Sequence, residues 1–284
     1  MQKNDHQEEQ MPVAVVTGSS TGIGRETSLI LAKEGFRTYA TMRNLDKSSD
    51  IMSRATREDL ALTVLQMDVD DNKSVNDTIE RIMKDNDRID VVVNNAGYAL
   101  IGAFEESTMQ DARAQMETNF FGTVRVIKAI LPIMRKQHRG TIVNVTSMGG
   151  RIAIPFDSFY HASKFALEGL SESLQYEMEP FGVKVILIEP GAVKSDFWKN
   201  LKSSGNIEDS PYRPVLQKLT ETFEKMTQNA IPPEQVAGVI LKALKSDNPD
   251  FRNTAGEDAK SILEVRSKSS DAEFYTFMKK QFGI

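Results

Sequence analysis

The chain of 284 residues has no cysteine and only three histidines. Without cysteine there is no disulfide, no thiolate nucleophile and no cysteine-based zinc site. The histidines, His6, His138 and His161, do not stand at metal-ligand spacing with carboxylates, so we expect no metal. We interpret His161 as a local helix residue rather than a general base. The chain also lacks a Gly-x-Ser-x-Gly elbow, which argues against a Ser-His-Asp hydrolase.

Long apolar runs and an excess of positive charge are also missing. No apolar stretch approaches the ~20 residues that span a bilayer. The first ten residues, MQKNDHQEEQ, lack the apolar core of a signal peptide. We therefore expect residues 1–10 to form a disordered polar tail and the protein to be cytoplasmic, with no membrane partner. The formal net charge of −5 argues against a nucleic-acid partner, because binding a phosphate backbone needs a dense basic face.

Strand and helix patterns alternate along most of the chain, which is typical of an α/β protein. The runs that predict buried strands are Val13–Thr17, Arg37–Met42, Leu62–Met67, Asp90–Asn94, Thr141–Thr146 and Lys184–Glu189. Helical patterns follow the first strand up to Gly35 and then cover Ser74–Asp85, Met109–Lys136, Tyr160–Glu179 and Pro233–Lys245. We predict one Rossmann-type domain over residues 11–284, with a doubly wound parallel sheet and helices on both faces. The last thirty residues read as a short strand and one closing helix.

One stretch, residues 195–215, breaks this alternation because Ser, Gly, Asn and Pro cluster there. We interpret it as the start of a substrate loop or lid at about 195–230. Phe197 and Trp198, the only tryptophan, would line an apolar pocket there or would merely anchor the loop. The other walls of the pocket are expected from Tyr98–Ile101 and Met148–Ile154.

A glycine-rich turn, TGSSTGIG, follows the first predicted strand. Glycine permits positive φ angles and close backbone approach, and the N-terminus of the next helix attracts a pyrophosphate. The turn therefore predicts a dinucleotide site, although such a turn can also be only a tight strand-to-helix connection. The cofactor-binding residues expected from this turn are Gly18, Ser20, Thr21, Gly22, Ile23 and Gly24.

The end of the second predicted strand indicates which dinucleotide binds. Met42 stands where an acid would bond the ribose 2′-hydroxyl, and Arg43 and Asn44 follow it. Because Arg43 can make charge-assisted bonds to a 2′-phosphate, we predict NADP rather than NAD. The alternative is that Arg43 is only a solvated surface charge. Further cofactor contacts are expected at the next two strand ends, from Asp68, Val69, Asn95, Ala96 and Gly97.

Ser147, Tyr160 and Lys164 form a pattern that suits carbonyl chemistry. Ser147 follows a predicted strand, and Lys164 lies one helical turn after Tyr160 on the same face. A lysine ammonium beside the phenol would lower its pKa by up to ~3 units, about 4 kcal/mol, toward neutrality. Ser147 would hydrogen-bond the substrate oxygen. Each residue alone is ordinary, but together behind a glycine turn they predict an active site.

With these motifs the chain resembles the classical short-chain dehydrogenase/reductase family, from about residue 13 to the C-terminus. In that family Asn119, Ser147, Tyr160 and Lys164 correspond to the catalytic tetrad, Tyr160 and Lys164 also contact the cofactor, and Asn119 helps to hold a proton relay. The segment PGAVKS implies nicotinamide contacts from Pro190, Gly191, Val193 and Ser195, the last replacing a threonine. The strand end YATMRN and the C-terminal residues also resemble the branch with 17β-hydroxysteroid and retinol dehydrogenases. The resemblance further implies a homodimer or homotetramer.

The sequence thus predicts an NADP(H)-dependent oxidoreductase that interconverts a carbonyl and an alcohol on a hydrophobic small molecule. Tyr160 would be its general acid and base, and Ser147, Tyr160, Phe197 and Trp198 would contact the substrate. The alternative is a non-catalytic NADP(H)-binding regulatory or sensor protein on the same fold. A complete tetrad favours the enzyme, because a sensor has no need of an acid–base tyrosine.

Overall fold

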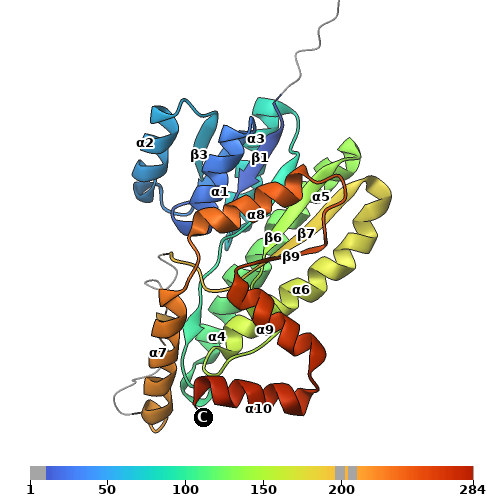
Figure 1. Cartoon of the computed structure of the whole chain (residues 1–284). Coiled ribbons are helices and arrows are strands. Elements are labelled where there is room, and N and C mark those ends of the chain that lie inside the picture. The colour runs from blue at the N-terminus through green and yellow to red at the C-terminus, as the bar shows by residue number, and fades with distance from the viewer. Residues whose placement is uncertain (1–10, 196–201, 204–209, 284) are drawn as a thin grey trace, which may run out of the picture.

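The computed structural model of the chain describes residues 11–195, 202–203 and 210–283. The expected tail, residues 1–10, and the pair Phe197 and Trp198 lie outside the described residues. Figure 1 shows the strands of one sheet crossing the middle of the molecule, with helices packed around them.

The central sheet has seven parallel strands in the order β3-β2-β1-β4-β6-β7-β9. The chain leaves β1 in one direction to β2 and β3, and then returns to the other side of β1 with β4. Ligands bind at such a switch in strand order, outside the carboxyl ends of the strands. The strands are β1 (Val13–Val16), β2 (Arg37–Met42), β3 (Leu62–Gln66), β4 (Val91–Asn94), β6 (Gly140–Val145), β7 (Val183–Pro190) and β9 (Arg252–Ala255).

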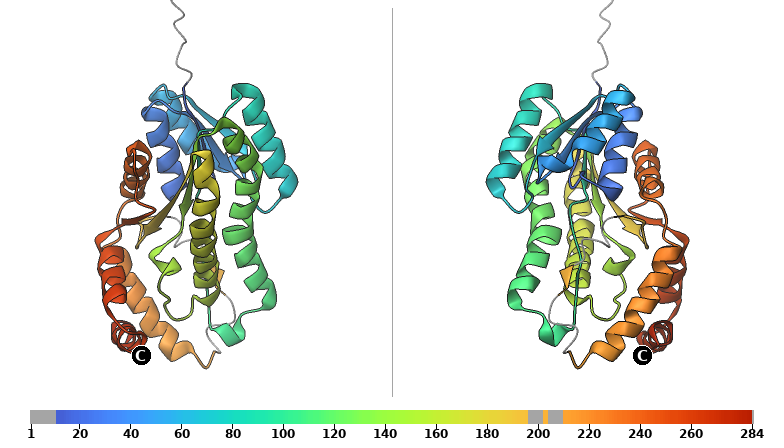
Figure 2. Two further views of the ribbon diagram at one scale, coloured as in Figure 1. Left: turned by 90° about the vertical axis from the view of Figure 1, so that its right-hand side faces the viewer. Right: turned by 90° about the vertical axis from the view of Figure 1, so that its left-hand side faces the viewer.

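Helices cover both faces of the sheet, which confirms the predicted doubly wound Rossmann architecture (Figure 2). The alternation of side chains along β1 explains the two layers. Val13 and Val15 belong to the apolar cluster under one set of helices, and Ala14 and Val16 to the cluster under the other. The first set is α3 (Asn72–Asn86), α5 (Thr123–Gln137) and α6 (Ser158–Met178), and the second is α1 (Gly22–Lys33), α2 (Ser49–Arg57) and α8 (Pro233–Lys245).

The long helix predicted over Met109–Lys136 is one helical run with an irregular centre. It consists of α4 (Met109–Met116), the π-helical segment η3 (Glu117–Gly122) and α5. The wider turn was not predicted, because hydrophobic spacing does not report a single extra residue. Such π segments are rare and are frequent at functional sites, and Asn119 lies within this one.

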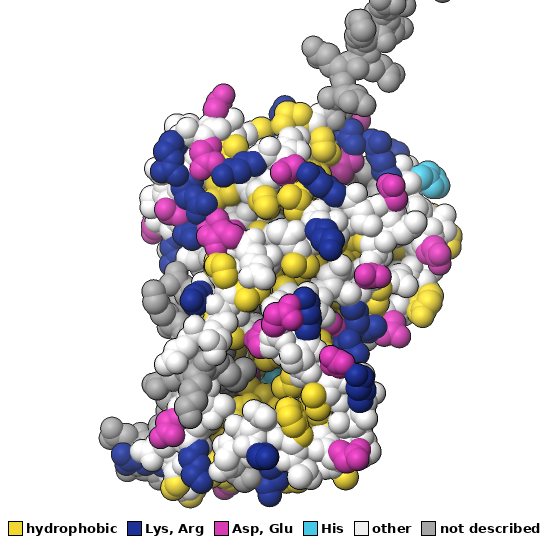
Figure 3. Space-filling view, viewed as in Figure 1, with side chains coloured by type: hydrophobic (Ala, Val, Ile, Leu, Met, Phe, Trp, Pro, Cys, Tyr) yellow, Lys and Arg dark blue, Asp and Glu magenta, His cyan; other side chains and the backbone are white. Residues whose placement is uncertain are grey.

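The C-terminal part differs most from the prediction. Two helices, α9 (Glu257–Lys268) and α10 (Asp271–Phe282), follow β9 instead of one, and α7 (Arg213–Gln228) lies within the expected lid region. α7, α9 and α10 bury a separate apolar cluster that includes Ile152. In the lower part of Figure 3, apolar side chains gather between these helices, while acidic and basic side chains are interspersed over the whole face. A short parallel pair, β5 (Leu100–Ile101) and β8 (Lys202–Ser203), lies apart from the main sheet.

None of the helices within the described residues has the length and apolar character that crossing a membrane requires. Likewise, the described His, Asp and Glu side chains do not gather into any group of three that could hold a metal ion.

Candidate functional site

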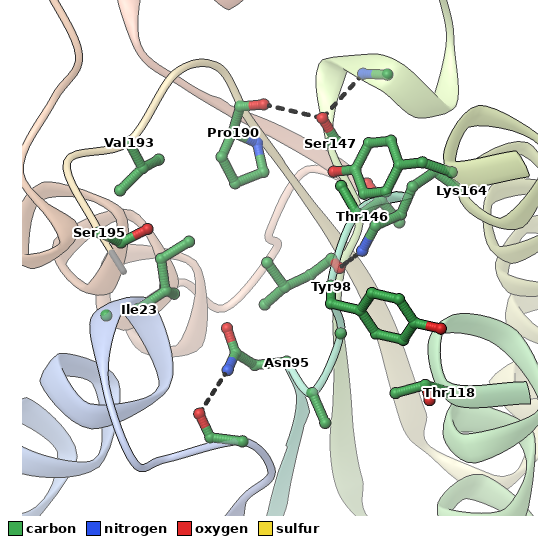
Figure 4. A pocket seen from close by; sticks show the side chains of 18 of the residues that line it. Ile23, Asn95, Tyr98, Thr118, Thr146, Ser147, Lys164, Pro190, Val193 and Ser195 are labelled. Atoms are coloured by element: carbon green, nitrogen blue, oxygen red, sulfur yellow. Dashed lines mark hydrogen bonds between the residues drawn. The ribbon is translucent and has the colours of Figure 1, made fainter. Parts of the chain in front are cut away.

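A cavity of about 630 Å³ lies outside the carboxyl ends of the central strands. Figure 4 shows side chains from the glycine turn, from β4, from β6 and from the segment after β7 converging on it. Most residues predicted for the site line this cavity, although they come from distant parts of the chain. They are Gly18, Ser20, Thr21, Gly22, Ile23, Arg43, Asp68, Val69, Asn95, Ala96, Gly97, Ser147, Tyr160, Lys164, Pro190, Gly191, Val193 and Ser195. Gly24, Asn44 and Asn119 are absent from its lining.

The glycine turn brings bare backbone to the cavity. Gly18 has φ +68°, and a side chain at this position would meet the Ala96 backbone at 2.8 Å. Thr21 is the N-cap of α1 but makes no side-chain cap hydrogen bond, so the first N–H groups of the helix are not satisfied by this side chain. Gly24 lies behind the turn, where a Cβ would collide with the carbonyl oxygen of Gly18. The turn therefore has the form of an anion cradle at a positive helix end.

The end of β2 supplies two cations to the cavity wall. Arg43 was predicted, and Lys47 beyond it also lines the cavity. Asn44 holds the connection between them, since its Oδ1 accepts a hydrogen bond from the Asp46 N–H at 2.9 Å. Its role is thus to cap the short 3-10 helix Leu45–Lys47 rather than to line the cavity. The sequence did not predict Lys47 as a site residue, because its place in the cavity wall depends on this short 3-10 turn.

Ser147, Tyr160 and Lys164 all line the cavity. Figure 4 shows Ser147 and Lys164 there. The Oγ of Ser147 accepts a hydrogen bond from the Gly149 N–H at 3.0 Å and donates to the Pro190 carbonyl at 3.4 Å. The Lys164 ammonium lies 5.7 Å from the centre of the Tyr160 ring. It donates to the Val145 carbonyl at 3.0 Å.

The pKa of Tyr160 moves opposite to our expectation. Burial raises the pKa of this phenol, and a hydrogen bond with Ser147 lowers it by less than burial raises it. Lys164 is only 6% exposed, and burial lowers its own pKa to about 8. The prediction of a phenol acidified by Lys164 was wrong for the protein alone, because removing both groups from water disfavours both charged forms.

Asn119 lies behind the cavity rather than on it. The side chain is 1% exposed and bonds the Tyr98 backbone twice, accepting from its N–H at 3.1 Å and donating to its carbonyl at 2.9 Å. It also donates to Ser163 Oγ at 3.1 Å, which links η3 to α6. These contacts position the segment after β4 against the helix that carries Tyr160.

His161 has the local structural role that the sequence indicated. Its Nε2 accepts the Ile154 N–H at 3.0 Å, so the proton is on Nδ1, which lies 2.8 Å from the Gly149 carbonyl. Burial lowers the pKa of the ring, so it is neutral near pH 7. Both nitrogens are therefore engaged in fixing the loop over the cavity.

Sequence reasoning missed two acids and one threonine in the cavity wall. Asp157 lines the cavity and is only 6% exposed, and burial raises its pKa to about 8. In the sequence it precedes the Tyr160 helix and reads as an ordinary N-cap. Asp70 and Thr118 also line the cavity, joined by a hydrogen bond from the Thr118 hydroxyl to Asp70 Oδ2 at 2.8 Å. No local pattern marks any of these three residues.

Comparison with known proteins agrees with this geometry. A family model described as short chain dehydrogenase matches residues 12–206. A 3-ketodihydrosphingosine reductase of Bacteroides thetaiotaomicron is 37% identical, covering 92% of this chain and 93% of its own. The human 17-beta-hydroxysteroid dehydrogenase type 1 is 34% identical, covering 95% of this chain and 86% of its own.

Solved structures show the same fold over nearly the whole chain. A short-chain dehydrogenase from Streptomyces avermitilis is 30% identical, with a TM-score of 0.81 over 97% of this chain and 99% of its own. One from Burkholderia cenocepacia, in complex with NADP, is 25% identical, with a TM-score of 0.74 over 94% and 97%. One from Burkholderia phymatum, in complex with NAD, is 21% identical, with a TM-score of 0.80 over 91% and 93%.

Proposed function

The chain belongs to the short-chain dehydrogenase family, and from that premise we propose that it interconverts a carbonyl and an alcohol on an apolar small molecule with NADP(H). Membership makes the protein an oxidoreductase of CH–OH and C=O groups with a nicotinamide cofactor. The observation that carries the finer proposal is the convergence of Ser147, Tyr160 and Lys164 on the cavity that also receives the glycine turn.

Several features of the cavity support a dinucleotide with a 2′-phosphate. The turn with Gly18 leaves space where a side chain would stand, and the N-terminus of α1 opens there without a side-chain cap. Arg43 and Lys47 line the same cavity, and Met42 is buried where an acid would hold a ribose diol. Two cations at this edge support NADP over NAD, because they can pair with the extra phosphate.

In the reduction direction, a nicotinamide held in this cavity would supply the hydride for the carbonyl carbon. Tyr160 donates its hydroxyl proton to the carbonyl oxygen, and Ser147 Oγ hydrogen-bonds that oxygen as negative charge develops. The raised pKa of Tyr160 keeps the phenol protonated and ready to donate. Lys164 then stabilises the phenolate, and its pKa of about 8 allows it to exchange a proton near neutrality. Asn119 acts as a positioning residue, since it holds the Tyr98 segment and α6 together.

The substrate end of the cavity supports an apolar substrate. Ile101, Met148, Ile152 and Ile154 line it, from the segments after β4 and β6. Apolar side chains with a few convergent polar groups are typical of small-molecule sites. α7 lies within the substrate lid predicted over about 195–230, and in this proposal it is the helical part of that lid.

We also propose a homodimer or homotetramer built on the outer surface of η3 and α6. Phe121, Phe165 and Tyr176 are exposed there, and the two elements pack against each other. Exposed aromatic groups on neighbouring helices favour burial against a second copy. Light scattering on the eluting protein measures the molar mass directly, and a monomer at micromolar concentration contradicts this arrangement.

An NADPH-oxidation screen over ketones and aldehydes of increasing apolar size tests the main proposal. We expect turnover of medium-chain or aromatic carbonyls and a loss of about 10³-fold in kcat for Tyr160→Phe, since general acid catalysis contributes 10²–10⁴-fold. NADPH binding should survive this substitution, because the turn and the two cations are untouched. Cofactor binding without turnover, unchanged by Tyr160→Phe, would leave the non-catalytic sensor instead.

A further inference from the structure

The turn that leads into α6 holds Asp157 in an unusual conformation. Phe156, directly before it, has φ +64°, a left-handed conformation that a bulky aromatic side chain rarely adopts. The Phe156 carbonyl accepts the Gly102 N–H at 2.9 Å, and its ring packs edge-on against Tyr212 at 6.0 Å. A strained conformation fixed from two sides often marks a residue placed for function.

Asp157 does not do what an aspartate at this position normally does. It is the N-cap of α6, yet its side chain makes no cap hydrogen bond. Aspartate is among the preferred N-cap residues because its carboxylate accepts a hydrogen bond from the first turn. Here the carboxyl lies in the cavity wall, with Oδ1 buried and without a hydrogen-bond partner among the described residues. The chain thus forgoes a helix cap and buries a polar group at the same residue.

No charged neighbour in the described structure satisfies this carboxyl. Oδ2 lies 3.9 Å from His161 Nε2, but that nitrogen accepts the Ile154 N–H and so has no proton to donate. Lys164 donates to the Val145 carbonyl, and no cation contributes to the shifted pKa of Asp157, for which burial is the sole cause. A buried carboxyl without a donor gains most from a ligand that brings both a positive charge and N–H groups.

We propose that Asp157 determines specificity by binding a primary ammonium group on the carbon next to the reacting carbonyl. The substrate class is then an amino ketone, or the matching amino alcohol, with an apolar chain. This inference rests on the proposed function, because Tyr160 marks where the carbonyl oxygen lies. Asp157 and Tyr160 line the same cavity from the start of α6, so we place a group bound by the carboxyl beside the reacting atoms.

An ammonium at Asp157 also suits the chemistry at Tyr160. Burial is the main cause of the raised pKa of Tyr160, and Asp157 in its ionised form raises that pKa further. A positive group bound between the carboxyl and the carbonyl cancels that effect and favours charge developing on the oxygen.

Three matched ketones test the proposal with NADPH as reductant: 2-aminononan-3-one, 2-hydroxynonan-3-one and nonan-3-one. We expect the amine to have a kcat/KM at least about 100-fold above that of nonan-3-one, because only it pairs the buried carboxyl. Asp157→Asn should remove this advantage and change nonan-3-one by less than about 3-fold. The control is Asp85→Asn, which removes one negative charge from the exposed surface of α3 and should change none of the three.

Octylammonium provides a readout that needs no turnover. It should raise the melting temperature of the wild-type holoenzyme and of Asp85→Asn, but not that of Asp157→Asn. Equal kcat/KM for the three ketones, or octylammonium stabilisation that survives Asp157→Asn, overturns the proposal. A hydroxy ketone as good as the amine also overturns it, since Asp157 would then act as a neutral hydrogen-bonding acid. No turnover of any of the three ketones, together with no effect of Tyr160→Phe, contradicts the proposed function. Octylammonium binding still decides the role of Asp157 in that case.

Discussion

The buried carboxyl of Asp157 should make the stability of the protein depend on pH in a defined way. Its pKa is raised from the usual 3.8 to about 8 by burial. The folded state therefore keeps a proton that the unfolded state releases between these two values. Stability follows the difference in bound protons, so the contribution of Asp157 falls as pH rises from about 4 to about 8. Above that range the loss is complete and constant.

The size of this effect follows from the shift. One pKa unit corresponds to about 1.4 kcal/mol, so the full penalty is about 5 to 6 kcal/mol and the part between pH 5 and pH 7 is about 3 kcal/mol. Asp157→Asn keeps the shape of the side chain and removes its titration. The variant should therefore gain about 3 kcal/mol over the wild type between pH 5 and pH 7, or about 6 °C in melting temperature at roughly 2 °C per kcal/mol.

Urea unfolding of the wild type, Asp157→Asn and Asp85→Asn at half-unit steps from pH 5 to pH 9 measures this difference. Other titrating groups are shared by the proteins, so they cancel when the variant is compared with the wild type. The difference should grow between pH 5 and pH 8 and then stay level, whereas Asp85→Asn should show no such slope. A difference that is flat across the range refutes a buried, unpaired Asp157.

Three further predictions concern the cofactor and its surroundings. Arg43→Ala and Lys47→Ala should each weaken NADPH by about 10-fold or more and leave NADH within about 2-fold, by fluorescence titration; equal losses for both nucleotides contradict the 2′-phosphate assignment. Lys164→Met should raise the free energy of unfolding at pH 7 by up to about 3 kcal/mol while abolishing turnover, because burial lowers the lysine pKa from 10.5 to about 8. That gain should fade as pH rises toward 10.5, where the unfolded lysine also loses its proton, and a gain unchanged at pH 10 excludes this cause. Gly24→Ala should cost about 1–3 kcal/mol in urea unfolding, because its methyl group collides with the Gly18 carbonyl; a neutral substitution means that the turn is free to shift.

Much of the fold and site follows from local pattern. Buried strands read as continuous apolar runs, as in VAVV of β1, and a glycine turn between strand and helix needs no distant information. Tyr160 and Lys164 share a cavity because four residues make about one helical turn. Ser147 joins them because parallel strands end at one edge of the sheet.

What the sequence could not show depends on tertiary burial. The direction of the Tyr160 pKa was wrong because the charge of Lys164 was counted and the loss of water around both groups was not. Asp157 looked like a helix cap, and only the positive φ of Phe156 and the surrounding loop turn it into the cavity wall. Lys47 reaches the cavity through a capped 3-10 turn, which is too short to show a hydrophobic periodicity in the sequence.

The wide turn in η3 makes this part of the chain unusually sensitive to length. A π turn holds one more residue than an α turn, so deleting one residue from 117–122 would let regular α-helical winding run from α4 into α5 without the wide turn. Asn119 would then leave the Tyr98 backbone that it bonds on both sides. Substitutions along this helix keep the wide turn, whereas a one-residue deletion removes it. The segment should therefore tolerate substitutions much better than the deletion of a single residue.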